Sequence, residues 1–182
     1  MEAAPIERRG PGRVAFAIAI AIGIAALLVT GGIVLSRRVT TASRLSAQAN
    51  ALVADLTFAR AQAIKQGRAV VTCASSDGAT CSDSNNWQRG WMVCLDANSS
   101  DRCDPGDPVY RVQKGFDSGD SFSASGNTSA VQFNREGFSI GLAGTVTITL
   151  HDASASRSST RCVEISAVGT VQLQKAGIGS CR

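Results

Sequence analysis

Six cysteines are the residues of this sequence with the widest range of possible chemistry. No two of them stand in a Cys-X-X-Cys spacing, which argues against a zinc ribbon and against a thioredoxin-type redox site. An even number of cysteines is typical of disulfides formed in an oxidising compartment. Six cysteines allow fifteen connectivities, and free thiols or a redox pair are the alternative to structural bridges. The order along the chain favours local pairs, which are Cys73 with Cys81, Cys94 with Cys103, and Cys162 with Cys181.

Histidine-dependent catalysis has little support, because His151 is the single histidine of the chain. The sequence places it beside Asp152 and several serines, in a predicted loop after a strand, where a solvated side chain is expected. No nucleophile and base can be paired from the sequence, and no glycine-rich phosphate loop is present. We therefore expect a protein without enzymatic activity and without a cofactor.

An acidic loop follows one of the predicted strands and contains Asp96, Asp101, Asp104 and Asp107. Carboxylate oxygens are ligands that calcium prefers. An EF-hand, however, needs glycine at the sixth loop position, where Asp101 stands here. A solvated acidic loop is the first expectation, and a calcium site is the alternative.

Basic residues exceed acidic residues by four over the 182 residues, an excess too small to indicate a nucleic-acid-binding protein. From residue 61 onward, 11 basic residues balance 11 acidic ones. The C-terminal part still has a local basic excess that could contact phosphates, and DNA binding is therefore kept as an alternative function. The residues concerned are Arg157, Arg161, Lys175 and Arg182.

Residues 14–35 form a run of 22 residues without a charge. At 1.5 Å per residue a helix of this length spans about 33 Å, which matches a hydrocarbon core of about 30 Å. We expect a single-pass helix in the inner membrane, with residues 1–13 as a short cytoplasmic leader. A cleaved secretory signal is the alternative, although its apolar region is usually about 7–15 residues long. The residues predicted to insert into the membrane and to bundle with other helices are Phe16, Ile18, Ile20, Ile22, Gly23, Leu27 and Leu28.

An amphipathic continuation of this helix is predicted for residues 36–66. Apolar residues recur there at spacings of three and four, as in a helix with one buried face. The residues predicted to pack this face on the rest of the protein are Leu45, Leu52, Leu56 and Ile64. Gly67 is expected to end the helix.

Beyond Gly67 the pattern changes to the alternation typical of β-strands. Seven strands are predicted, at residues 68–74, 90–96, 109–114, 130–135, 145–150, 161–167 and 170–174. A long helix followed by a series of strands predicts an α+β fold, with the helix laid across an antiparallel sheet. Residues 67–182 would then form a disulfide-stapled periplasmic head.

Several segments together resemble the GspH/FimT family of type IV pilin-like proteins. On the predicted helix they are residues 52–56 (LVADL) and 59–67 (ARAQAIKQG), followed by residues 70–73 (VVTC). In the head they are residues 76–78 (SDG) with Cys81, 87–93 (WQRGWMV), 131–134 (VQFN) with Gly137, and 162–166 (CVEIS) with Gly169. The resemblance covers roughly residues 40–182. Within it Trp91 is expected in the core, while the position of Trp87 is left open.

The resemblance implies a pilin-like fold and the role of a minor pilin of type IV pili or a minor pseudopilin of type II secretion. Such a protein is a structural subunit that helps to initiate or cap a filament. Its implied partners are other pilins or pseudopilins, an inner-membrane assembly platform and a prepilin peptidase, with methylation of the new N-terminus.

Two features of the sequence depart from the family pattern. The family usually has a glutamate shortly after its peptidase site, but Ile20 or Ala17 stands there in this sequence. FimT-like members that bind DNA have a basic Gly-Arg-X-Arg segment, and the equivalent residues 169–172 (GTVQ) contain neither arginine. A minor pilin or pseudopilin is thus the first hypothesis, followed by a DNA-binding minor pilin and by a secreted, signal-cleaved protein unrelated to filaments.

Overall fold

The computed structural model describes the backbone of residues 11–116 and 118–181. Within the long helix it describes the side chains of residues 40–66, together with those of Phe16, Ile20 and Ile22. The chain divides into two units, Met1–Thr40 and Thr41–Arg182. The second unit contains the sheets and carries the candidate site.

Helix α1 spans Pro11–Gln66. It begins slightly before the predicted start, because proline is well accepted in the first turn, where its missing N–H costs no hydrogen bond. It ends where the sequence predicted, since Gly67 adopts a φ of 63°. The N–H groups of Gly67 and Arg68 donate to the carbonyls of Ile64 and Ala63, at 3.4 and 3.3 Å. These are the two hydrogen bonds of a Schellman cap.

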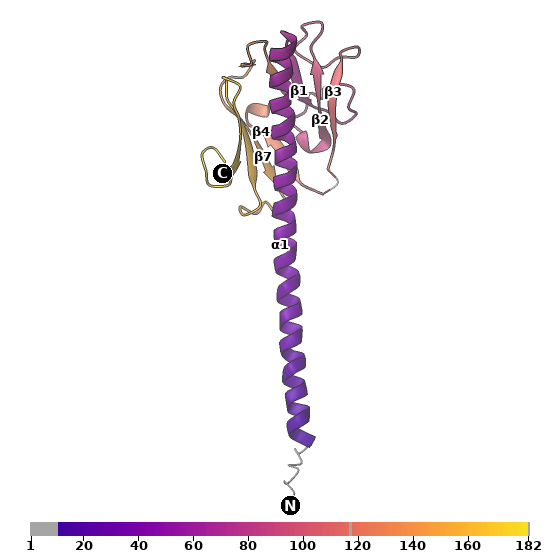
Figure 1. The fold of residues 1–182 in the computed structure, drawn as a ribbon, viewed down its shortest axis with the longest axis vertical. Coiled ribbons are helices and arrows are strands. Elements are labelled where there is room, and N and C mark those ends of the chain that lie inside the picture. The colour runs from indigo at the N-terminus through magenta and orange to yellow at the C-terminus, as the bar shows by residue number, and fades with distance from the viewer. Residues whose placement is uncertain (1–10, 117, 182) are drawn as a thin grey trace, which may run out of the picture. The chain divides into compact units, whose positions relative to one another are not determined.

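Two antiparallel sheets make up the head, where the sequence predicted one. The first contains β1 Val70–Ala74, β2 Gly90–Leu95, β3 Val109–Lys114, β5 Ala130–Phe133 and β6 Ser139–Ile140, in the order β3-β2-β1-β5-β6. The second contains β4 Ser121–Ala124, β7 Val146–His151, β8 Arg161–Ile165 and β9 Val171–Lys175, in the order β4-β7-β8-β9. Residues 41–66 of α1 lie in front of both sheets in the view of Figure 1.

The seven predicted strands are confirmed, with ends within two residues of those expected, but β4 and β6 were not predicted. β6 is only two residues long, too short for an alternation to be visible, and β4 has one large apolar side chain, Phe122. Both depend on pairing for their conformation, because β4 lies along β7 and β6 lies along β5.

One face of α1 forms the centre of the main core. Its fully buried residues are Leu45, Ala49, Leu52, Leu56, Ala59 and Ala63, which share a cluster with residues of both sheets. Leu45, Leu52 and Leu56 are thus where the sequence placed them. Ile64 is different, because its side chain remains 52% exposed. It lies one residue beyond the buried Ala63 and beside Gly137 of the head.

A second, smaller cluster lies on the other face of the first sheet. Alternation along β1 places Val70 and Ala74 in the main core, and Val71 and Cys73 in this outer cluster. Met92 and Cys94 join the cluster from β2, and Cys103 joins it from the loop that follows β2. β1 is therefore buried along its whole length.

Replacing Leu52 by alanine tests the main core. Removing a fully buried leucine side chain should lower the free energy of unfolding by about 2–5 kcal/mol. The matched control is Ile64→Ala, for which we expect about 1 kcal/mol or less, because half of that side chain is already in water. Urea unfolding followed by the fluorescence of Trp87 and Trp91 measures both. Equal losses for the two variants would contradict this assignment of the core.

Candidate functional site

The residues that fix α1 to the head form the candidate site. The family resemblance implies a subunit that acts by assembly, and such a subunit must hold its helix and its head together. The first contact is made by Arg44. Its guanidinium donates to both carboxylate oxygens of Asp120, at 2.8 and 3.1 Å, and the Asp120 side chain is fully buried. Ser118 donates a further hydrogen bond to the same carboxylate. A two-pronged arginine–carboxylate pair of this kind fixes direction as well as distance.

A second contact is centred on Asp55, halfway along the packed part of α1. One of its oxygens accepts the indole N–H of Trp91 at 2.8 Å, and the other accepts a guanidinium N–H of Arg111 at 2.8 Å. Arg111 also lies over the ring of Phe58, 3.7 Å from its centroid, in a cation–π contact. α1 is thereby tied to β2 and β3 at once. Trp91 is in the core, as predicted, and Trp87 is also fully buried.

The third contact joins α1 to two turns from different sheets. Nε of Arg60 donates to the carbonyl of Gly137 at 2.8 Å, in the turn between β5 and β6. Gly169, in the turn between β8 and β9, packs so closely that a Cβ there would lie 2.0 Å from that carbonyl oxygen. The N–H of Ser139 donates to the carbonyl of Ala167 at 3.1 Å, so the two sheets meet beside this point.

These contacts explain much of the sequence pattern that suggested the family. Asp55, Arg60, Trp91, Gly137 and Gly169 all belong to the matching segments, and the structure places each of them where α1 meets the head. The sequence alone gave no role to Asp55, Arg60 or Arg44 beyond lying off the apolar face. An isolated charge among apolar helical positions is too common to identify such a contact.

Arg161 is the clearest correction among the residues considered for DNA. It is only 8% exposed, and its Nε donates to the hydroxyl of Ser46 on α1 at 2.9 Å. Its Nη1 donates to the carbonyls of Ser158, Ser159 and Thr160. This guanidinium is therefore a further link between α1 and the second sheet, and it is not free to contact a phosphate.

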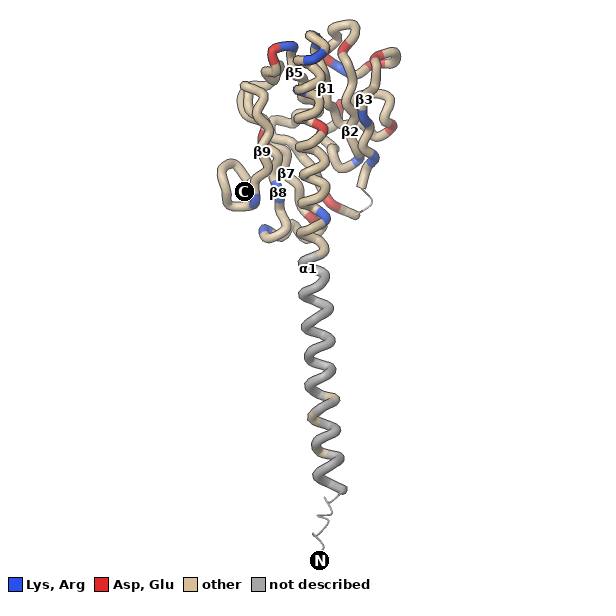
Figure 2. Tube along the Cα trace, in the orientation of Figure 1, with Lys and Arg blue, Asp and Glu red and all other residues tan. Residues whose placement is uncertain are grey.

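The other basic residues considered for DNA binding differ from Arg161. Arg157 and Lys175 are exposed, and Arg182 lies outside the described residues. In the described part of the head, basic and acidic segments are interspersed along the chain trace (Figure 2). Electrostatic binding to a nucleic acid depends on clustered positive charge, which this interspersed pattern does not favour.

The sequence predicted His151 in a loop, but the structure places it as the last residue of β7. Its Nδ1 lies 3.0 Å from the hydroxyl of Thr160, which itself donates to the carbonyl of Ser156. These contacts hold the start of the following loop against the strand.

The acidic loop closes on itself. Asp96 is almost fully buried and accepts the N–H groups of Ser100 and Asp101, both at 3.0 Å. Asp107 accepts the N–H groups of Ala97 and Asp104. The hydroxyl of Ser100 donates to Asp104 and, with other hydrogen bonds, holds the pKa of this carboxyl below its usual value. The carboxylates thus serve as acceptors for the loop's own donors.

The three disulfides join the cysteines in the order favoured by the sequence, as Cys73–Cys81, Cys94–Cys103 and Cys162–Cys181. The first two tie β1 and β2 to the loops that follow them, and the third ties the C-terminal tail to β8. The side chains of Ile18, Gly23, Leu27 and Leu28 lie outside the described residues, while Phe16, Ile20 and Ile22 are exposed. Within the portion whose placement is described, no helical stretch has the length and apolarity to cross a membrane.

Substituting Gly169 by alanine tests the meeting point of the two turns. The new methyl group would collide with the Gly137 carbonyl, and such overpacking costs about 1–3 kcal/mol, in addition to the strain of a positive φ. The matched control is Gly141→Ala, because Gly141 has a similar φ but open space around its Cβ position. We expect the Gly169 variant to lose clearly more free energy of unfolding in urea. A loss no larger than that of the control would refute the close contact.

Comparison with known proteins finds solved structures of similar fold. A solved structure of the type IV minor pilin FimU of Pseudomonas aeruginosa is similar, with a TM-score of 0.59, 22% identity, and coverage of 72% of this chain and 89% of that one. The minor pseudopilin EpsH of the type 2 secretion system of Vibrio cholerae is also similar, with a TM-score of 0.52, 12% identity, and coverage of 72% and 97%. At these identities the likeness concerns the fold. A search of curated protein sequences finds no match.

The sequence itself matches a family model over residues 48–169, a range that includes the helix contacts of Asp55 and Arg60, all of the first sheet and most of the second. This range is well over half of the chain. The protein is therefore a member of the family described as type II transport protein GspH.

Proposed function

We propose that the chain is a minor pilin or pseudopilin, a structural subunit that helps to initiate or cap a type IV pilus or a type II secretion pseudopilus. The observation that carries the proposal is the set of polar contacts at Arg44, Asp55 and Arg60, which surround the apolar face of α1 and bind it to both sheets. A filament built by bundling helices needs each head to follow its helix. Family membership and the likeness to FimU and EpsH support the same role.

The N-terminal part of α1 would anchor the protein and then assemble. In this proposal residues 14–35 hold the subunit in the inner membrane, with residues 1–13 in the cytoplasm and the head in the periplasm, where its disulfides can form. The same apolar side chains, among them Phe16, Ile20 and Leu27, would later pack against neighbouring helices in the filament. Partners are then other pilins or pseudopilins and the assembly platform.

A position at the end of a filament fits the N-terminal sequence better than a position in its shaft. In the family a buried glutamate near the new N-terminus would pair with the terminal amine of a neighbouring subunit. Ile20 or Ala17 stands at that place here, so this subunit lacks the acid for such a pair. A single subunit at the end can dispense with a contact that every repeating subunit requires.

The DNA-uptake alternative gains no support from the head. Of the four basic residues considered, Arg161 is buried and engaged with Ser46 and three carbonyls. The segment 169–172 lacks the arginines of the DNA-binding members, and its Gly169 is packed against Gly137. We therefore propose the structural role alone.

Placing an arginine at Ala21 tests the membrane anchor. A charge near the middle of the bilayer costs about 2.5–3.5 kcal/mol on insertion scales, so Ala21→Arg should move the protein out of the membrane fraction. The control is Ala47→Arg, because Ala47 is an exposed residue of α1 outside the apolar run. Fractionation of cells that express each variant measures the outcome. Unchanged retention of the Ala21 variant would count against the anchor.

Deleting the gene tests the role in assembly. We expect loss or strong reduction of surface pili, or of type II secretion, because filament growth would lack its initiating or capping subunit. Wild-type protein should restore the filament, and the Ala21→Arg variant should not. Electron microscopy and secretion assays read the two systems separately. Normal filaments and normal secretion in the deletion strain would exclude the proposed role.

A further inference from the structure

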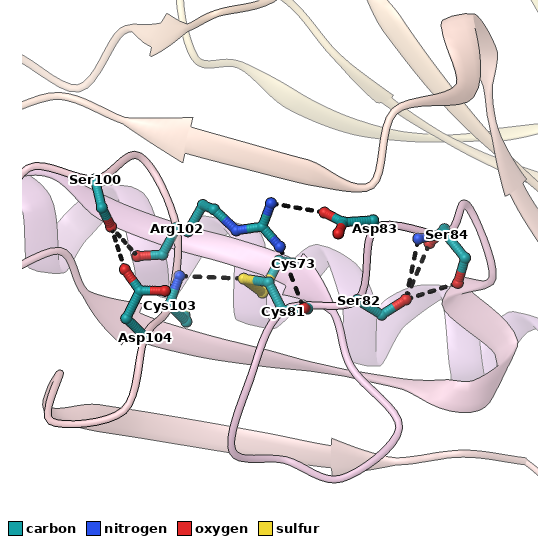
Figure 3. Close-up of polar contacts among 9 residues, drawn as sticks. All are labelled: Cys73, Cys81, Ser82, Asp83, Ser84, Ser100, Arg102, Cys103 and Asp104. Carbon is teal, nitrogen blue, oxygen red and sulfur yellow. Dashed lines mark hydrogen bonds and ion pairs between the residues drawn. A yellow bond between two sulfur atoms is a disulfide. The ribbon is translucent and has the colours of Figure 1, made fainter.

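Two disulfides lie against each other on the outer face of the first sheet. Figure 3 shows Cys73, Cys81 and Cys103 close together, and their Sγ atoms are all within 4.8 Å of one another. Cys103 is nevertheless bonded to Cys94. Because all three sulfurs are in disulfides, none is a thiolate that could hold a metal ion. The chemistry open to such a group is thiol–disulfide exchange, in which a thiolate attacks a neighbouring disulfide sulfur.

Cys81 differs from the other three cysteines in its exposure. Cys73 and Cys94 are fully buried and Cys103 is 1% exposed, whereas Cys81 is only half-buried in the loop between β1 and Trp87. Of these four residues, Cys81 is therefore the one that a thiol in solution can approach. Exchange depends on access to the sulfur that is attacked, so reduction of this pair of disulfides would begin at Cys81.

The surroundings of Cys81 also favour a thiolate. The backbone N–H of Cys103 donates to Sγ of Cys81 at 3.1 Å, and the N–H of Cys81 donates to the carbonyl of Cys103 at 3.4 Å. The guanidinium of Arg102, which pairs with Asp83, donates to the carbonyl of Cys81. An N–H donor at the sulfur and a nearby guanidinium both stabilise negative charge on that sulfur, although Asp83 offsets part of the positive charge. Cys73, in contrast, is a fully buried thiol when reduced.

We propose that Cys81 is a thiol–disulfide exchange site, attacked by a reduced dithiol, through which both outer disulfides are opened in sequence. This inference does not depend on the proposed filament role. The partner is defined by its chemistry as a protein or small molecule with two neighbouring thiols.

The exchange balances in three steps. A thiolate of the dithiol attacks Sγ of Cys81, and the sulfur of Cys73 leaves and takes up a proton. The second thiol of the reductant loses its proton and attacks the mixed disulfide, so the reductant departs as a disulfide and Cys81 is released as a thiolate. This thiolate attacks Sγ of Cys103, forming a Cys81–Cys103 bond, and the sulfur of Cys94 leaves and takes up a proton. Two electrons enter, and one disulfide and two thiols remain.

The full chain tests the sequence of steps directly. It is treated with a limiting amount of dithiothreitol, quenched with acid, labelled with N-ethylmaleimide and mapped by mass spectrometry without further reduction. We expect label on Cys73 and Cys94 and a peptide in which Cys81 is joined to Cys103. Cys162–Cys181 is the internal control and should stay intact, because both of its cysteines are fully buried. Label on Cys73 and Cys81, with Cys94–Cys103 intact, would overturn the proposal.

A pair of single variants identifies the attacking sulfur without any reductant. Cys73→Ser leaves Cys81 free beside an intact disulfide, so Cys94 should become labelled as Cys81 joins Cys103. Cys81→Ser leaves the buried Cys73 free, and label on Cys94 should be about tenfold lower, because burial in apolar surroundings disfavours the attacking thiolate. Equal labelling of Cys94 in the two variants would refute the special role of Cys81. If either variant fails to fold, the wild-type experiment decides.

Discussion

The packing of one helical face against two separate sheets is the interaction on which the head depends. Leu45, Leu52 and Leu56 fill the space between the layers, while Ala49, Ala59 and Ala63 allow the backbone of α1 to approach the strands. Buried apolar side chains from both sheets belong to the same cluster as this face. Because apolar contact is the main favourable contribution to folding, removing the helix would leave both sheets without the centre of their core.

Apolar packing alone would leave the position of the helix loosely determined, because it has little directionality. Hydrogen bonds and ion pairs depend strongly on geometry. Such contacts therefore fix the axial position and the rotation of α1 relative to the sheets. They lie near one end of the packed segment at Arg44 and Ser46, in its middle at Asp55, and near its other end at Arg60. The two-pronged pair with Asp120 and the contact of Arg60 with Gly137 are separated by 16 helical residues, so they resist tilting as well.

The sequence predicted those parts of the fold that leave a periodic signal. The buried face of α1, its end at Gly67, seven strands and the order of disulfide pairing were accessible in this way, because each depends on residues close together in the chain. Division into two sheets was not accessible, since β4 forms by pairing with β7, which lies beyond β5 and β6 in the chain. β6 was missed because it is a strand of two residues along its neighbour β5. The burial of Arg161 was also hidden, because its partner Ser46 lies 115 residues away. An exposed basic residue and a buried one look alike in sequence.

The outer cluster around Val71, Cys73, Met92 and Cys94 has a consequence for biosynthesis. Its apolar side chains are covered by loops that carry Cys81 and Cys103, so the cover depends on disulfides, which form in oxidising compartments. In a reducing cytosol the newly made chain would expose an apolar strip along β1 and β2, where self-association can start. For the periplasmic head proposed above, prompt translocation would keep this strip from associating, and cytosolic overproduction would favour insoluble material.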